Sequence, residues 1–226
     1  MNMKNKYSFL GASDAALSMF IEIIASNEGQ QFSLKIIRNV ETKQIHEYLI
    51  PGIQTEILSD KAWQRNTEEK ILIGVNKSEN KRLVYKYFSE NHNIQFEDYS
   101  ILMHKNGSVA STVKLGHGVI LNPGVVLAPF AQIGNLVTVN RNVSVGHHST
   151  LSDFCTLHPG VNIAGHCNIS SGVTIGMGTN VIDGVSIGEN TIVGAGSLVT
   201  KDLPDNVVAF GSPAKVVKTI SNSESN

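Results

Sequence analysis

The chain has 226 residues, and its 18 Lys and Arg residues nearly balance its 19 Asp and Glu residues. This balance argues against nucleic acid or an anionic membrane as a partner. No apolar run approaches the roughly 20 residues that a membrane-spanning helix needs. We therefore expect a cytoplasmic protein that binds neither nucleic acid nor membranes.

The first elements are predicted from a change of period near the N-terminus. A short apolar run at residues 7–10 comes before Gly11, and a helical period then follows through Ala16, Phe20 and Ile24. This order predicts a strand, a tight turn and a helix. Further strands are predicted at residues 34–37 and 71–75, whereas residues 41–63 carry no pattern that predicts an element.

A second helix is predicted after residue 75, with Leu83, Val84, Tyr87 and Phe88 on one face. Strands that alternate with helices predict a small parallel α/β domain, a Rossmann-like sheet, over residues 1–100. Ligands of such sheets bind at the carboxyl ends of the strands.

The turn at Gly11, Ala12 and Ser13 lies at such an end and leads into a helix N-terminus. Free N–H groups and positive potential there suit a phosphate. A dinucleotide fingerprint has three glycines, whereas this loop keeps one and has Ala16 at the place of the last. The loop alone fits a structural turn as well as a nucleotide site.

A six-residue repeat organises residues 101–204. An aliphatic residue recurs at every sixth position from Val109 to Val199, and a small or β-branched residue follows nearly every one of them four places later. A period of six predicts a parallel β-helix, in which each repeat makes one short strand and one corner of a prism. Three repeats close one coil, so residues eighteen apart are stacked about 4.8 Å apart.

Two residue types recur at fixed places in this repeat. Gly or Asn often follows the aliphatic residue directly, as at Gly116, Asn140 and Gly146, and we expect positive φ angles at these corners. The two cysteines, Cys155 and Cys167, occupy the small inward position, which predicts compact core residues and no disulfide.

Residues 205–226 form a C-terminal extension, and its Ser/Asn-rich end at 221–226 is expected to be disordered. Residues 211–215 read Gly-Ser-Pro-Ala-Lys. A hexapeptide prism closed by this segment resembles the left-handed β-helix acyltransferases. Three further segments narrow the resemblance to one group of these enzymes: the turn at 11–13, the Ile-Leu-Ile-Gly strand end at 71–74, and Met103-His104. The chain is similar to nucleotide-sugar acyltransferases that include the bacillosamine and perosamine N-acetyltransferases and the sialic acid O-acetyltransferases.

This resemblance implies a homotrimer with acetyl-CoA as co-substrate in the cleft between adjacent prisms. The small domain then holds a nucleotide-linked amino sugar, and a histidine on the prism acts as general base. The expected reaction is N-acetylation in surface glycan biosynthesis, such as that of lipopolysaccharide O-antigen. The best guess for the acceptor is UDP-4-amino-4,6-dideoxy-N-acetylhexosamine.

The resemblance places the general base at His147, on an outward corner. An imidazole that titrates near neutral pH suits proton removal from an attacking amine. Asn140 matches an asparagine near the acceptor amine, and it is equally a natural corner residue. Relatives carry an acidic residue beside the histidine, where this chain has His148. Asp183 and Asp153 both remain candidates for orienting the ring.

Cofactor contacts are also implied by the resemblance. Gly165 stacks next to His147 and leaves room for the thioester, with its N–H available to the developing oxyanion. Ala195 matches a backbone contact to the cofactor arm, and Lys215 is expected to meet phosphates of coenzyme A. His158 either replaces a family histidine that aligns with Thr156 or covers the interface.

For the substrate, Gly11, Ala12, Ser13 and Gly74 are the expected contacts of the small domain. Relatives often carry an acidic cluster after the second strand, and this chain has Arg38-Asn39 there. This departure leaves the nucleotide base open. The Arg38 guanidinium suits a diphosphate.

Three alternatives to N-acetylation remain. A sugar O-acetyltransferase uses the same base on a hydroxyl, and a non-catalytic prism has no turnover. A γ-type carbonic anhydrase needs three imidazoles around zinc between subunits. His148 and His166 stack eighteen residues apart, but no His pair shows that family's spacing. We therefore expect no metal.

Overall fold

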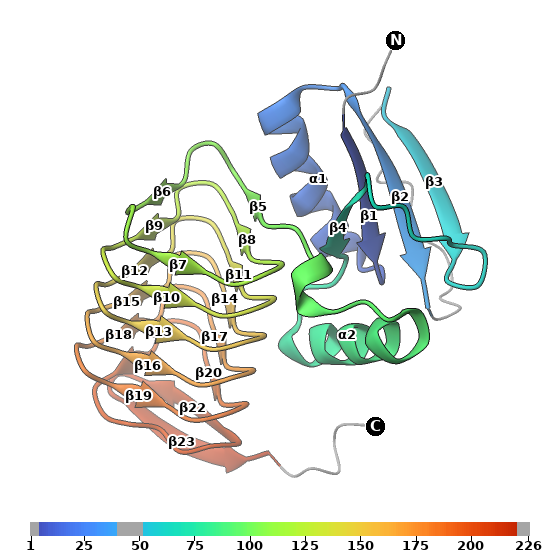
Figure 1. Cartoon of the computed structure of the whole chain (residues 1–226). Coiled ribbons are helices and arrows are strands. Elements are labelled where there is room, and N and C mark those ends of the chain that lie inside the picture. The colour runs from blue at the N-terminus through green and yellow to red at the C-terminus, as the bar shows by residue number, and fades with distance from the viewer. Residues whose placement is uncertain (1–4, 40–51, 221–226) are drawn as a thin grey trace.

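The structure is a computed structural model, and it describes residues 5–39 and 52–220. A small α/β domain lies beside a tall prism of short strands (Figure 1). The tail at 221–226, for which disorder was expected, lies outside the described residues.

The N-terminal domain is a four-stranded parallel sheet with the order β3-β2-β1-β4. Its strands are β1 (Asn5–Leu10), β2 (Phe32–Arg38), β3 (Gln54–Ser59) and β4 (Lys70–Ile73). The strands predicted at 7–10, 34–37 and 71–75 are confirmed. Strand β3 was missed because it lies at the sheet edge, where its side chains are exposed or half-exposed and form no apolar run.

Two helices accompany this sheet, α1 (Asp14–Glu28) and α2 (Ser78–His92). The face predicted for α2 is only half correct. Val84 and Phe88 are buried as expected, but Leu83 is 56% exposed. Lys81 takes its place on the buried face, since residues 81, 84 and 88 are spaced by one helical turn each. A lysine was not expected there because its ammonium needs acceptors that only the prism provides.

After a 3₁₀ turn, η1 (Phe96–Asp98), the chain winds into a left-handed β-helix with three faces. Face 1 holds β5 (Leu102–Met103), β8 (Ile120–Leu121), β11 (Thr138–Val139), β14 (Thr156–Leu157), β17 (Thr174–Ile175) and β20 (Ile192–Val193). Face 2 holds β6 (Ser108–Val109), β9 (Val126–Leu127), β12 (Ser144–Val145), β15 (Asn162–Ile163), β18 (Asn180–Val181) and β21 (Leu198–Val199). Face 3 holds β7 (Lys114–Leu115), β10 (Gln132–Ile133), β13 (Thr150–Leu151), β16 (Asn168–Ile169) and β19 (Ser186–Ile187).

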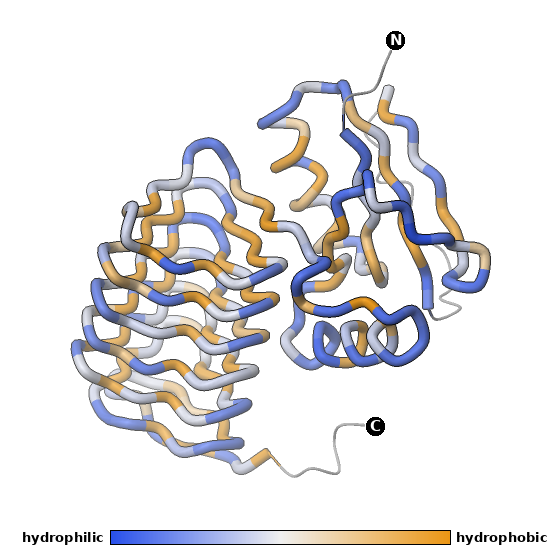
Figure 2. Tube along the Cα trace, viewed as in Figure 1, coloured by the Kyte–Doolittle hydropathy of each residue, from blue (hydrophilic) through white to orange (hydrophobic). Residues whose placement is uncertain are grey.

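The predicted register of eighteen residues is confirmed. Thr138 pairs with Thr156, and Ser144 pairs with Asn162, both in parallel. The aliphatic residues of the repeat fill the prism, and Figure 2 shows apolar residues at the same places in successive coils. Only the first coil is looser, where Val109 and Leu115 are partly buried. Cys155 and Cys167 are free, buried thiols, as predicted.

The expected positive φ directly after the aliphatic residue is wrong. The residues with positive φ stand three places after the aliphatic residue, for example Gly118, His148 and His166. Glycine directly after the aliphatic residue serves close stacking instead. A Cβ on Gly146 would lie 2.4 Å from the carbonyl carbon of Ala164 in the next coil, so only glycine allows the coils to approach.

Face 1 carries the N-terminal domain. Ser78 Oγ lies 3.2 Å from Thr156 Oγ1 and 3.0 Å from Thr174 Oγ1. Lys81 Nζ donates to the carbonyl of Leu136 at 2.8 Å and to that of Cys155 at 2.9 Å. Prism residues also join the domain's apolar core, so the two parts pack as one body.

The C-terminal extension completes face 1. Strand β22 (Val207–Gly211) pairs in parallel with β20, and β23 (Ala214–Thr219) returns antiparallel to it. Among the described residues, no helix has the length and apolar character to cross a membrane.

Candidate functional site

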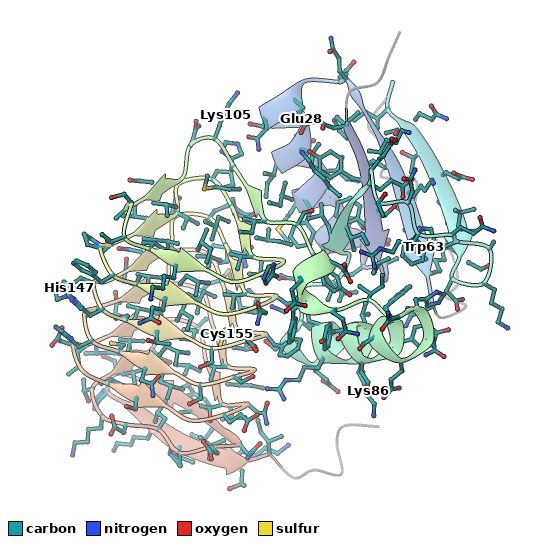
Figure 3. All side chains as sticks on the ribbon, in the orientation of Figure 1. Glu28, Trp63, Lys86, Lys105, His147 and Cys155 are labelled. Atoms are coloured by element: carbon teal, nitrogen blue, oxygen red, sulfur yellow. The ribbon has the colours of Figure 1, made fainter. Side chains whose placement is uncertain are left out.

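His147 lies on the edge between faces 2 and 3, which is opposite face 1. We call this edge the histidine corner; it comprises residues 129–130, 147–148, 165–166, 183–184 and 201–202. The ring is exposed, as the outward position predicted. Figure 3 shows His147 on the side of the prism that points away from the N-terminal domain.

Gly165 lies directly beside His147 in the next coil. A Cβ on Gly165 would lie 2.7 Å from His147 Cε1 and 2.9 Å from its Nε2. The same point lies 2.9 Å from Asp183 Oδ1. The missing side chain at Gly165 thus lets the imidazole and the carboxylate occupy one space.

This geometry distinguishes the two aspartates considered for orienting the ring. Asp183 approaches His147 across Gly165. Asp153 lies on a different corner, where its Oδ1 accepts the backbone N–H of Asn135 at 2.6 Å. Of these two aspartates, Asp183 is therefore the one that lies near His147.

Two further histidines adjoin His147, and the sequence analysis assigned neither a function. His147 Nδ1 and His148 Nδ1 are 3.2 Å apart. The rings of His148 and His166 are stacked, with centroids 5.0 Å apart and planes at 12°. The signal in the sequence was the adjacency of residues 147 and 148 together with the eighteen-residue step from 148 to 166.

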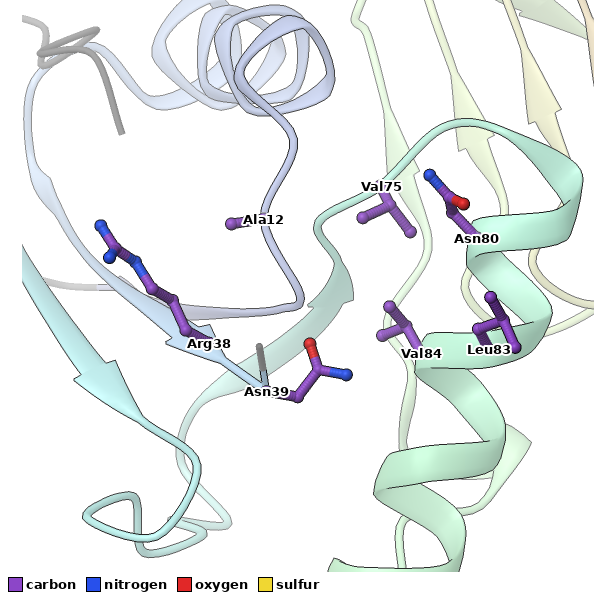
Figure 4. Close-up of a pocket in the computed structure, with 7 residues that line it drawn as sticks. All are labelled: Ala12, Arg38, Asn39, Val75, Asn80, Leu83 and Val84. Carbon is purple, nitrogen blue, oxygen red and sulfur yellow. The ribbon is translucent and has the colours of Figure 1, made fainter. Parts of the chain in front are cut away.

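A pocket of about 230 Å³ opens at the carboxyl ends of the N-terminal strands (Figure 4). Its walls are Ala12, Arg38, Asn39, Val75, Asn80, Leu83 and Val84. Three of the predicted substrate contacts thus share one pocket. Arg38 Nε is buried and has no hydrogen-bond partner among the described residues, so a donor remains available to a ligand.

The other predicted substrate contacts support this pocket without lining it. Gly11 has φ +74°, and a Cβ on Gly74 would lie 2.0 Å from the Gly11 carbonyl oxygen. Ser13 N donates to Gly74 O at 3.0 Å. Ser13 is also the N-cap of α1 and makes no side-chain capping bond. Gly11 and Gly74 are therefore both required for the close contact between the loop after β1 and the loop after β4.

A larger cleft of about 610 Å³ separates the start of α2 from face 1. Its walls include Asn76, Arg82, Leu83, Thr156, His158 and Thr174. Burial, and after it the charge of Lys81, lowers the pKa of His158. Asn76 Oδ1 and Arg82 Nε in this cleft are buried and have no hydrogen-bond partner within residues 5–39 and 52–220. Leu83 borders both this cleft and the pocket at the strand ends.

Asn140 lies one coil before His158 at the same place of the repeat. Its side chain is 2% exposed and donates from Nδ2 to Leu157 O at 2.8 Å. Asn122 makes the corresponding bond to Val139 O at 3.2 Å. The Asn140 amide therefore stabilises the corner by bonding to the backbone of the next coil.

Ala195 and Lys215, the remaining predicted cofactor contacts, are exposed. Ala195 stands on the corner between faces 1 and 2, and Lys215 lies on β23. The structure thus brings Gly165 to His147, but it places Asn140 and His158 on face 1, away from the histidine corner.

Known proteins share this architecture. Residues 166–201 match the family described as bacterial transferase hexapeptide (six repeats). No curated protein sequence gives a significant match. A variant of perosamine N-acetyltransferase from Caulobacter crescentus, solved with CoA and GDP-perosamine, is 26% identical; the match covers 95% of this chain and 97% of that one, with a TM-score of 0.78.

This chain is a hexapeptide-repeat protein with the fold of a sugar acetyltransferase. Two further structures share the fold at lower identity. The acetyltransferase domain of PglB from Neisseria gonorrhoeae FA1090, in complex with acetyl coenzyme A, is 19% identical with a TM-score of 0.78, and the match covers 95% of this chain and 100% of that one. WeeI from Acinetobacter baumannii AYE is 22% identical with a TM-score of 0.74, and the match covers 94% and 99%.

Proposed function

We propose that this protein transfers the acetyl group of acetyl-CoA to the amine of a nucleotide-linked amino sugar. The observation that carries the proposal is the likeness over nearly the whole chain to a perosamine N-acetyltransferase solved with CoA and GDP-perosamine. The acceptor we favour is a 4-amino-4,6-dideoxyhexose. Two features of the chain support this reaction, an exposed imidazole beside a glycine and a separate pocket with an unused guanidinium donor.

The nucleotide occupies the strand-end pocket in this proposal. Arg38 Nε and the uncapped N-terminus of α1 both present donors to a diphosphate. The sugar then extends past Leu83 into the cleft on face 1, whose wall includes His158. The amine is placed there for attack.

In the chemical step, the sugar nitrogen attacks the thioester carbonyl carbon. A C–N bond forms, and the C–S bond to coenzyme A breaks. His147 removes the proton of the attacking amine and returns it to the leaving thiolate, so that the products are the amide and the free thiol. The N–H of Gly165 stabilises the oxyanion, and Asp183 stabilises the imidazolium.

This arrangement needs a second copy of the chain. The pocket lies on the side of face 1, whereas His147 lies on the opposite corner, so one chain cannot bring both to the same sugar. A homotrimer in which the pocket of one protomer faces the histidine corner of the next satisfies the requirement. Coenzyme A then lies between adjacent prisms, along corners that carry Gly165, Ala195 and, at the end of the prism, Lys215.

The reaction is tested by free-thiol release from acetyl-CoA with nucleotide-linked 4-amino, 3-amino and non-amino sugars. The proposal predicts turnover with the 4-amino sugar. Turnover only with hydroxyl acceptors would establish an O-acetyltransferase instead, and no thiol release with any acceptor would contradict acetyl transfer.

The shared site is tested by mixing two variants that are each impaired when the nucleotide sugar is below its KM. Arg38→Ala removes the nucleotide contact, and His147→Ala removes the base. Co-expressed chains that assemble into mixed trimers contain some sites with both residues intact, so activity returns in part if the site is shared between chains. Activity no higher than in either variant alone would contradict a shared site.

A further inference from the structure

Three histidines converge on the histidine corner within a single chain. The ligating nitrogens of His147, His148 and His166 all lie within 4.8 Å of one another. Zinc binds imidazole nitrogen at about 2.0–2.1 Å, which places two nitrogens of a tetrahedral site about 3.3 Å apart. The 3.2 Å between His147 Nδ1 and His148 Nδ1 already matches this spacing.

The backbone fixes two of these rings relative to each other. His148 and His166 both occupy the left-handed position of their turns, with φ 58° and 56°. His166 N donates to His147 O at 2.9 Å, which holds the two turns in register. Phe130 stacks on the other side of His148 at 4.9 Å. The backbone therefore holds the three side chains in register, and the exposed rings bind one ion after rotating out of the stacked arrangement.

The Asp183 carboxylate lies near the outer edge of this histidine set. His147 directs Nδ1 toward His148, whereas Nε2 and Asp183 Oδ1 approach the same point above Gly165. A metal-ligating histidine usually donates its other N–H to a carboxylate, which orients the ring and raises its basicity. His147 is thus arranged to bind through Nδ1, while its Nε2 faces the space that it shares with Asp183.

We propose that His147, His148 and His166 bind one divalent transition-metal ion of the zinc class. An all-imidazole donor set selects Zn²⁺, Ni²⁺ or Cu²⁺ and disfavours Mg²⁺ and Ca²⁺, which take oxygen ligands. The three rings are exposed in the chain, so the ion exchanges with solvent. Because His147 is also the base of the proposed function, a bound ion inhibits turnover reversibly; only this consequence rests on the proposed function.

The binding test uses untagged protein, because a polyhistidine tag would itself take up metal. Calorimetric titration with ZnCl₂ is expected to show one ion per chain, and Co²⁺ is expected to give the visible absorption of a tetrahedral site. His148→Gln and His166→Gln each weaken Zn²⁺ binding by about 100-fold or more, as loss of a ligand should exceed the 10–100-fold effect of an outer contact. His117→Gln, an exposed histidine on another corner, is the matched control and leaves binding unchanged.

Absence of Zn²⁺ binding by the parent chain overturns the proposal, as does binding that both His148→Gln and His166→Gln leave unchanged. Turnover gives a separate readout: Zn²⁺ inhibits the parent strongly and His166→Gln much less, each compared with its own rate without metal. Zn²⁺ binding without any acetyl transfer would refute the proposed function and leave the metal site standing, whereas acetyl transfer without Zn²⁺ binding would do the reverse.

Discussion

His147 and Asp183 share the space that a side chain on Gly165 would fill. His147 Nε2 and Asp183 Oδ1 each lie 2.9 Å from the point where a Gly165 Cβ would stand. The two residues are 36 positions apart in the sequence, which is two coils of the prism. The glycine between them allows a carboxylate to influence the imidazole of another coil.

The Asp183 carboxylate is expected to act on rate and not on substrate binding. Asp183→Asn keeps the shape but removes the charge that stabilises the imidazolium, so kcat falls roughly tenfold, about 1.4 kcal/mol in the barrier, while KM stays near its parent value. Steady-state kinetics measure both. Asp153→Asn is the matched control, because its carboxylate caps Asn135 N on another corner; an equal loss of kcat in both variants would refute the assignment.

A methyl group at Gly165 is expected to separate His147 from Asp183. Gly165→Ala places the Cβ 2.7 Å from His147 Cε1, so the ring or the carboxylate must move. Turnover should fall at least about tenfold, since the base then leaves its position. Gly165 lacks a positive φ, so the thermal midpoint should change little. Full turnover in Gly165→Ala would show that catalysis does not depend on the space that His147 and Asp183 share.

Arg38 is expected to contribute to binding of the nucleotide sugar. Arg38→Ala removes a guanidinium whose buried Nε has no partner in the described chain. KM for the nucleotide sugar should rise about tenfold or more, with kcat largely retained, because the contact is the same in the ground and transition states. Arg65→Ala, which breaks a surface pair with Asp98, is the control. Equal KM values for both variants would exclude Arg38 from the site.

Lys81 makes stability depend on pH. Burial lowers the pKa of Lys81 to about 7 from its usual 10.5. Between pH 7 and about 10.4 the unfolded chain binds the proton that the folded chain has lost, so this residue's contribution to the free energy of unfolding rises with pH. Below pH 7 both states are charged, and the full cost of burying the ammonium remains.

The Lys81→Met variant isolates this contribution. Thermal midpoints of parent and variant are measured from pH 6 to pH 10, and their difference is taken at each pH. The parent should gain stability relative to the variant across pH 7 to 10. A constant difference over this window would show that Lys81 keeps its proton when buried.

The sequence predicted the prism almost completely, because a period of six repeated sixteen times leaves few alternative folds. It predicted the wrong place for positive φ, since glycine serves both left-handed turns and close stacking, and Gly146 reads alike for either use. Strand β3 was missed because an exposed edge strand lacks an apolar pattern.

For the site, the outward position of His147 and its contact with Gly165 follow from the repeat. The choice of Asp183 over Asp153 did not, because it depends on which corner each aspartate occupies and which atoms it meets. Lys81 was also beyond prediction from the sequence. Its acceptors are backbone carbonyls of Leu136 and Cys155, which lie 55 and 74 residues away.

The account depends most on His147 as the base for acetyl transfer. The direct measurement is the rate of thiol release from acetyl-CoA with a nucleotide-linked 4-amino sugar, for the parent, His147→Ala and the control His117→Ala on another corner. We predict a fall of about 10² to 10⁴-fold in His147→Ala with the oligomer retained, and a near-parent rate in His117→Ala. A His147→Ala variant that turns over at the parent rate would contradict the account.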